Sequence, residues 1–207
     1  MHGDFESAIL QVLLFWILTT PHEFAHAWVA DRLGDDTPRL QGRVTLNPMA
    51  HVDWIGTVML PILTSLMGGG FFGWGRAVMV NPLRLRGGMR GHLLVALAGP
   101  ASNVVFAVIF GFVAAMLNRA GSDVASLLAM AVNLSFYLAL FNLVPVPPLD
   151  GSAVLPFLNL PSGLMNELYR SGFVVLILLF SLTSFGQYLS HWSRVGTVTV
   201  LRLFGGL

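Results

Sequence analysis

Long apolar runs separated by short polar segments dominate the chain. A helix that crosses a bilayer needs about 20 mostly apolar residues, and four runs meet that length. They lie at about residues 7–30, 92–117, 124–146 and 171–188. The pattern predicts an all-α polytopic membrane protein with about four to six transmembrane helices, in place of a soluble globular domain.

A fifth apolar run, "WIGTVMLPILTSLMGGG" at 54–70, is short, contains Gly56 and Pro61, and ends in three glycines. We predict that it is re-entrant, since such a segment is tolerated where protein or a water-filled cavity covers its backbone. The alternative is that it crosses the bilayer completely.

Arginine placement favours the re-entrant interpretation. With the N-terminus outside and 54–70 re-entrant, only Arg119, Arg194 and Arg202 lie outside, and the other eight of the 11 basic residues lie inside. That bias fits the positive-inside rule. A complete crossing would move Arg76 to Arg90 to the other side and weaken it.

Two further segments have weaker patterns. "FFGWGRAVMVNP", at 71–82, mixes aromatic, β-branched and glycine residues, which predicts a short strand or β-hairpin. The tail after Tyr188 is short and mixed, which is typical of an interfacial amphipathic segment. We therefore expect one membrane-embedded domain over 1–207, with a catalytic core at about 8–155 and a C-terminal helix and tail at 165–207.

Composition supports the membrane interpretation and excludes other classes. Hydrophobic residues make up 55% of the chain and charged residues 10%, against roughly 25% charged in ordinary globular domains. Mean hydropathy is +0.74. The net charge is +1, so nothing indicates a nucleic-acid partner. The chain has 0 cysteines, which excludes disulfides, thiolate metal sites and a cysteine nucleophile.

The first apolar run ends in the polar cluster "PHEFAH", which holds His22, Glu23 and His26. Residues four apart share a helix face, so both imidazoles would point at one ion, with Glu23 beside them. H-E-x-x-H is the pattern of two zinc ligands and a general base. One alternative is a chance match. Another is that the helix ends near Thr20, which would make the cluster merely interfacial.

Catalytic zinc normally has three protein ligands, and Asp150 is our candidate for the third. It follows a long apolar run with no other charge nearby. Pro145, Pro147 and Pro148 would break the preceding helix, and Gly151 permits a sharp turn. The alternative is that Asp150 caps the next helix. The expected cofactor is one Zn²⁺ per chain, on His22, His26 and Asp150.

Three motifs together resemble the site-2 protease family of intramembrane zinc metalloproteases: "HEFAH" at 22–26, "GPASN" at 99–103 and "NLVPVPPLDG" at 142–151. The resemblance covers about residues 8–155. It is to a minimal form of the family, without PDZ or CBS domains. It implies three core helices, zinc on His22, His26 and Asp150, and Glu23 as the catalytic base. It also implies peptide hydrolysis within the membrane, on the cytoplasmic side of its middle.

The resemblance also extends to 71–82, which is similar to the family's "FGWAKPVPVNP" and differs by the loss of two prolines and a lysine. In the family this region is thought to be an edge strand that pairs with extended substrate. Asn142 and Asn103 are candidate substrate-binding residues. Asn142 would hold the substrate backbone or the oxyanion, or else a neighbouring helix. For Asn103 we favour helix packing.

These features predict an intramembrane zinc endopeptidase acting on single-span membrane proteins, in the lipid bilayer of a prokaryotic plasma membrane. The competing hypothesis is a non-proteolytic metal-binding membrane protein, either a transporter or a scaffold. Transport needs a chain of polar residues across the bilayer, and the apolar helices offer none outside the one cluster. The presence of Glu23 argues against a silent scaffold.

Overall fold

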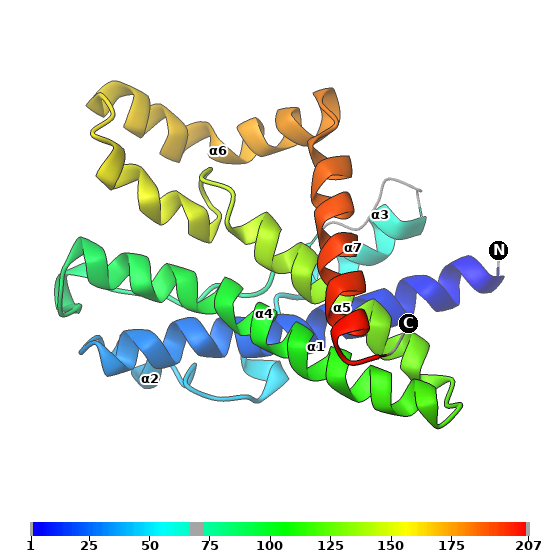
Figure 1. The fold of residues 1–207 in the computed structure, drawn as a ribbon. Coiled ribbons are helices and arrows are strands. Elements are labelled where there is room, and N and C mark those ends of the chain that lie inside the picture. Colours follow the sequence, from blue (N-terminus) through cyan, green and yellow to red (C-terminus); the bar gives the residue numbers. More distant parts are fainter. Residues whose placement is uncertain (1, 67–72, 206–207) are drawn as a thin grey trace. The chain divides into compact units, whose positions relative to one another are not determined.

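The computed structural model describes residues 2–66 and 73–205. In that part of the chain every regular element is helical (Figure 1). The chain divides into two compact units, Met1–Gly91 and His92–Leu207. The first contains α1 (His2–Arg32), α2 (Thr37–Leu40), η1 (Pro48–Ala50), η2 (Trp54–Met59), α3 (Leu60–Leu66) and η3 (Pro82–Arg84). The second contains most of α4 (Met89–Arg119), then α5 (Val124–Asn142), η4 (Asp150–Leu158), α6 (Ser162–Leu182) and α7 (Phe185–Leu203).

Helix α1 organises the first unit, and α2, η1, η2 and α3 all contact it. The helix is 31 residues long and continues through Pro21, so the alternative in which it ends near Thr20 is wrong. One buried stripe holds Phe15, Leu18 and Ala30, at 2%, 1% and 0% exposed. Spacings of three and four residues put the zinc-motif histidines on this same face.

Three helices in the described residues are long and apolar enough to cross a membrane: α4, α5 and α6. Each overlaps one of the four predicted spans, and together they fit an all-α membrane protein. Helix α1 is not among the three. Helix α6 begins earlier than the predicted run and ends before Thr183, where the backbone turns extended.

The apolar run at 54–70 forms a short helix over Trp54–Thr64. Asp53 is its N-cap, and the Asp53 carboxylate accepts the N–H groups of Ile55 and Gly56. At about 1.5 Å per residue such a helix is shorter than the roughly 30 Å of bilayer hydrocarbon. Whether the run is re-entrant or crosses the bilayer completely stays a prediction. The end of the run, at 67–70, lies outside the described residues.

The strand or hairpin predicted at 71–82 is not confirmed. Residues 71 and 72 lie outside the described part, and residues 73–81 form an extended segment without any strand assignment. Its hydrogen-bond partners are backbone carbonyls and side chains outside the segment. No second strand lies beside it in the described residues.

The C-terminal tail forms α7, which packs along α5 within the second unit. Asn133 of α5 donates to Ser193 Oγ at 3.4 Å and to Thr197 Oγ1 at 3.3 Å. Gly196 lies against the ring of Phe136, where a Cβ would be only 3.1 Å from the ring. The predicted interfacial segment is therefore a helix that turns its small polar residues toward α5.

Candidate metal centre

The buried face of α1 brings two imidazoles together. His22 and His26 are 5% and 7% exposed, and their Nε2 atoms lie 3.1 Å apart. Two nitrogens on one tetrahedral zinc ion are about 3.3 Å apart, given Zn–N bonds of about 2.0–2.1 Å. The ring planes meet at 84°. The two side chains therefore fit one zinc ion without a rearrangement of the helix.

Glu23 lies beside them and is also buried, at 8% exposed. Its Oε2 accepts the backbone N–H of Val78 at 3.1 Å. Gly75 lies over the same carboxylate, because a Cβ built there would be 3.4 Å from Oε1. The extended segment at 73–81 thus covers the glutamate and fixes its orientation.

The start of that segment is tied to η2. Trp74 donates its N–H to the carbonyl of Gly56 at 3.0 Å, and its own carbonyl accepts the Thr57 hydroxyl at 2.9 Å. The indole also packs on Gly56, where a Cβ would be 2.2 Å from Nε1. Position 56 therefore has room only for glycine.

The middle of the segment is held by His51 and Arg43. Arg76 donates its N–H to the carbonyl of His51 at 2.9 Å, and its carbonyl accepts Arg43 Nη1 at 3.3 Å. His51 is fully buried, and its Nε2 pairs with the carbonyl of Thr45 at 2.8 Å. That contact gives His51 a structural role in the first unit.

These contacts alternate along the chain. Trp74, Arg76 and Val78 turn their N–H groups inward to protein acceptors. In extended backbone the next residues turn theirs to the opposite edge. Within the described part of the chain, no hydrogen bond uses the N–H or C=O groups of Gly75, Ala77 or Met79. The segment therefore has one satisfied edge and one open edge.

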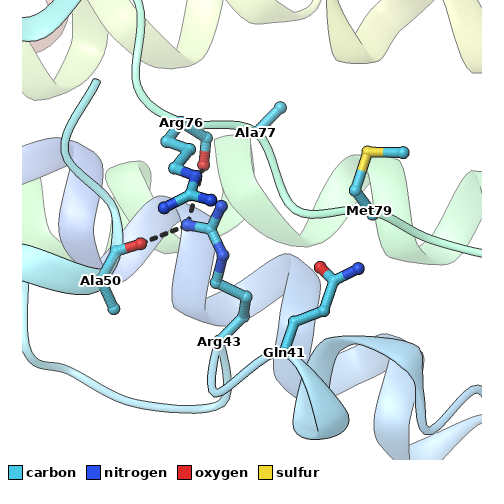
Figure 2. Close-up of a pocket in the computed structure, with 6 residues that line it drawn as sticks. All are labelled: Gln41, Arg43, Ala50, Arg76, Ala77 and Met79. Carbon is cyan, nitrogen blue, oxygen red and sulfur yellow. Dashed lines mark hydrogen bonds between the residues drawn. The ribbon is translucent and has the colours of Figure 1, made fainter. Parts of the chain in front are cut away.

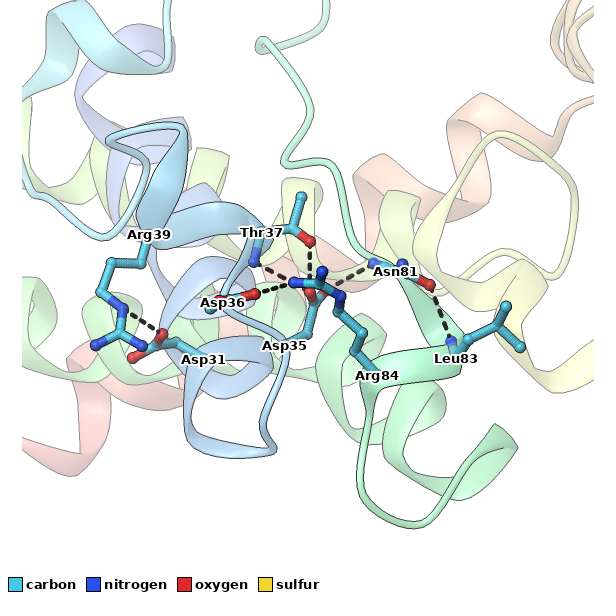
Figure 3. Close-up of polar contacts among 8 residues, drawn as sticks. All are labelled: Asp31, Asp35, Asp36, Thr37, Arg39, Asn81, Leu83 and Arg84. Carbon is cyan, nitrogen blue, oxygen red and sulfur yellow. Dashed lines mark hydrogen bonds and ion pairs between the residues drawn. The ribbon is translucent and has the colours of Figure 1, made fainter.

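The end of the segment is anchored by Asp35, which is fully buried. Its carboxylate accepts the Asn81 N–H at 2.6 Å, the Thr37 hydroxyl at 2.6 Å and the Thr37 N–H at 3.1 Å (Figure 3). Burial alone would raise the pKa of Asp35. The three hydrogen bonds and the charge of Arg84 outweigh burial and lower that pKa.

Two ion pairs flank this anchor (Figure 3). Asp36 pairs with Arg84 of η3, and Asp31 pairs with Arg39 of α2 at 3.1 Å. Asn81 caps η3 by accepting the N–H of Leu83 at 3.1 Å. The polar surroundings of the C-terminal end of α1 therefore fix where the extended segment ends.

In the second unit, Asp150 is the first residue of η4, and Leu149 is the cap residue, without a side-chain hydrogen bond. The alternative interpretation of Asp150 as a helix cap is therefore wrong. A Cβ on Gly151 would be 2.2 Å from the carbonyl oxygen of Leu143. Glycine is thus required for the turn that follows the prolines, as the sequence indicates. The role of Asp150 as third zinc ligand stays a prediction.

Neither asparagine role is tested by its contacts. Asn142 donates Nδ2 to the carbonyl of Leu138, one turn back on α5, at 2.9 Å. Asn103 is fully buried in α4. The sequence interpretation missed Asp35, Arg43 and Val78 as residues that support Glu23. Their contacts join distant positions, such as the 55 residues between Glu23 and Val78, which leave no local pattern.

Known proteins with similar sequences agree with this site. The chain is 35% identical to the "Putative zinc metalloprotease YwhC" of Bacillus subtilis over 208 residues, covering 95% of this chain and 91% of that protein. It is 32% identical to the "Putative zinc metalloprotease Rip2" of Mycolicibacterium smegmatis over 160 residues, covering 75% of this chain and 60% of that protein. The Rip2 of Mycobacterium tuberculosis is 30% identical over 154 residues. No family model matches the chain, and no solved structure matches it.

The apolar helices and the buried H-E-x-x-H site define a membrane protein of the metalloprotease class. The extent of the YwhC match shows that the chain belongs to the same family of zinc metalloproteases. Its cofactor is zinc, which the donor set of His22 and His26 fits.

Proposed function

We propose that this protein is an intramembrane zinc endopeptidase of the site-2 protease type, which hydrolyses peptide bonds within or near the transmembrane segments of single-span membrane proteins. The observation that carries the proposal is the contact between Glu23 and the extended segment. It puts an open backbone edge next to the general base of a zinc motif, in a chain with membrane-spanning helices.

The open edge has the chemistry of a peptide-binding site. Unpaired N–H and C=O groups pair with an extended peptide by β-augmentation. Gly75, Ala77 and Met79 offer such groups beside Glu23. A substrate helix must unwind before it can be cut, because its own hydrogen bonds otherwise shield the peptide bond. Pairing with this edge would compensate for the bonds that unwinding breaks.

His22, His26 and, by our proposal, Asp150 would hold the zinc ion. When bound, zinc supplies Lewis acidity for the attacking water and the scissile carbonyl. Glu23 takes the proton of the attacking water and later passes it to the leaving amine. The Val78 N–H holds Oε2, which leaves Oε1 for the proton transfer. Asn142 and Asn103 remain candidates for contacts to the substrate.

The proposal also includes the membrane in which the protein lies and the side that its active site faces. The chain would lie in a prokaryotic plasma membrane, and the arginine distribution supports an orientation with the first unit's loops on the cytoplasmic side. Arg84 and Arg86 lie exposed near the C-terminal end of α1. The active site would then face the cytoplasm.

The decisive experiment compares the wild type with Glu23→Gln, both purified in detergent and loaded with zinc. We expect equal zinc content by elemental analysis, because Glu23 is not a ligand. Cleavage of a panel of labelled single-span substrates should fall by about 10²–10⁴-fold in the variant, the usual contribution of a general base. Equal zinc content with equal activity would show that Glu23 is not the base. If both proteins bind zinc and neither cleaves any substrate, the transporter or scaffold hypothesis gains.

A further inference from the structure

A pocket of about 630 Å³ adjoins the extended segment within the first unit (Figure 2). It has no part in the chemistry described so far. Its lining combines the loop after α2 with the middle of the segment: Gln41, Arg43, Ala50, Arg76, Ala77 and Met79. The two arginines lie next to each other, with their guanidinium groups at the pocket (Figure 2).

Arg43 is buried, at 5% exposed. Its Nη1 donates to the carbonyls of Ala50 and Arg76. No hydrogen bond in the described residues uses its Nε or Nη2. Burial lowers the pKa of Arg43, the charge of Arg76 lowers it further, and Glu23 partly opposes both. Two adjacent cations with remaining donors form a site that attracts an anion.

Glu23 offsets part of the charge of Arg43, but the described carboxylates of the first unit make their direct contacts elsewhere. Each one described in atomic detail has another partner: Glu23 has Val78, Asp31 has Arg39, Asp35 has Thr37 and Asn81, Asp36 has Arg84, and Asp53 caps η2. No salt bridge in the described part of the chain involves Arg43 or Arg76. The pocket therefore keeps an excess of positive charge.

The position of Arg76 connects the pocket to the open edge. Its backbone belongs to the extended segment, with open-edge residues Gly75 and Ala77 on either side. When a peptide pairs with an extended segment, side chains on the same face are cross-strand neighbours, with Cβ atoms about 4.5–5.5 Å apart, and opposite charges there attract. A peptide at the open edge would thus place one side chain beside the exposed Arg76.

We propose that the pocket of Arg43 and Arg76 is a specificity subsite that accepts an acidic side chain, Glu or Asp, of the substrate. This subsite rests on the proposed function, since it assumes a peptide along the open edge. Arg76 makes the contact, and Arg43 supports it from the buried side. A lipid headgroup has related charge chemistry, but Ala77 and Met79 of the peptide-binding segment line the pocket directly, which favours a peptide.

Peptide binding tests the subsite without the need for cleavage. The probe is a fluorescently labelled, extended Val/Ala peptide that carries Glu, Gln or Lys at its centre, added to the full chain in lipid nanodiscs without anionic lipid. We expect the wild type to bind the Glu peptide about tenfold more tightly than the Gln peptide, the effect of one charge-assisted hydrogen bond. Arg76→Gln should abolish the difference, and Arg76→Glu should favour the Lys peptide.

Arg76 is the right position to change, because its fold contacts use its backbone and its side chain is exposed. Arg43 also supports two carbonyls, so its loss would disturb the fold. The matched control is Arg90→Gln, which removes an exposed arginine of the same unit outside the pocket. The control should keep the tenfold preference.

Equal affinity for the three peptides, or no binding of any of them, would overturn the subsite. So would a Glu preference that disappears when phosphatidylglycerol is added, because that result identifies a headgroup site. The proposed function fails separately. Cleavage without a Glu preference removes the subsite alone, and a Glu preference without any cleavage by the zinc-loaded wild type removes the protease proposal alone.

Discussion

Single buried charges determine how the first unit presents its glutamate. Asp35 accepts three hydrogen bonds, and one of them comes from the backbone of Asn81 at the end of the extended segment. Glu23 accepts another from Val78 in the middle of that segment. A buried carboxylate is stable only when such donors replace water. The segment and the two acids therefore stabilise each other.

Asp35→Asn should lower stability in a pH-dependent manner. The pKa of Asp35 is lowered in the folded protein, so its stabilisation is complete above the unfolded pKa of about 3.9 and is lost as pH falls through the folded pKa. Near pH 7 we expect the variant to lose about 1–3 kcal/mol, since Asn cannot accept all three bonds. Thermal unfolding in detergent from pH 7 down to acid measures this effect.

The comparison variant is Asp36→Asn, which removes a neighbouring acid whose side chain is 42% exposed. Exposed ion pairs contribute roughly 0–1 kcal/mol, so its loss should be small. At low pH the wild type and Asp35→Asn should converge. A constant difference between them at every pH would show that the charge of Asp35 is not what holds the segment.

At the scale of elements, the extended segment shows that a sequence pattern predicts local backbone structure but not its hydrogen-bond partners. The aromatic and β-branched residues of 71–82 predict a short strand or β-hairpin, whereas the described residues 73–81 have no strand assignment. They say nothing of the partners, which are the carbonyls of Gly56 and His51 and a helix carboxylate. The hydrogen-bond partners of a segment depend on tertiary contacts that the local sequence does not record. The pattern therefore predicted a hairpin where the structure has a single segment. The H-E-x-x-H helix was predictable because its ligands are four residues apart.

Gly56→Ala should detach the start of this segment. A Cβ at position 56 would be 2.2 Å from Trp74 Nε1, so the indole must move and the bond from Trp74 to the carbonyl of residue 56 should be lost. In residue-resolved hydrogen exchange, wild-type Trp74, Arg76 and Val78 should exchange more slowly than Gly75, Ala77 and Met79. The variant should lose that alternation and about 1–3 kcal/mol of stability, the usual effect of overpacking.

Gly163→Ala is the matched control, since a Cβ there has nothing within 4 Å. It should keep the alternation, and it should be neutral or slightly stabilising in α6. If Gly56→Ala also preserves the alternation, then the contact with Trp74 does not set the position of the segment.

For the whole molecule, apolar runs predicted α4, α5 and α6 because a span must be long and uncharged. The same rule could not place α7, whose apolar and polar residues are mixed and which packs on α5. The proposed zinc ligands also differ in how directly the sequence predicts them. The two histidines belong to the first unit and are predictable from their spacing, whereas Asp150 belongs to the second unit and was inferred from its isolation among apolar residues.

Asp150→Asn tests that inference at the scale of the whole chain. A carboxamide is a poor zinc ligand, and even outer-shell changes cost 10–100-fold in metal affinity, so we expect a loss of more than about 100-fold. Zinc that binds only the folded protein would also raise its stability, by about 2.7 kcal/mol at 100 times the dissociation constant. Zinc titration with a chelator, followed by thermal unfolding with and without the metal, measures both effects.

Asp123→Asn is the control, because Asp123 is exposed and makes no side-chain cap bond at the start of α5. It should bind zinc as the wild type does and unfold at the same temperature. His26→Ala should lose zinc whichever residue is the third ligand. If His26→Ala loses the metal and Asp150→Asn keeps it with unchanged affinity, the third ligand lies elsewhere. In that case zinc stabilisation would be expected in the first unit alone, and the "PPLDG" turn would have a purely structural role.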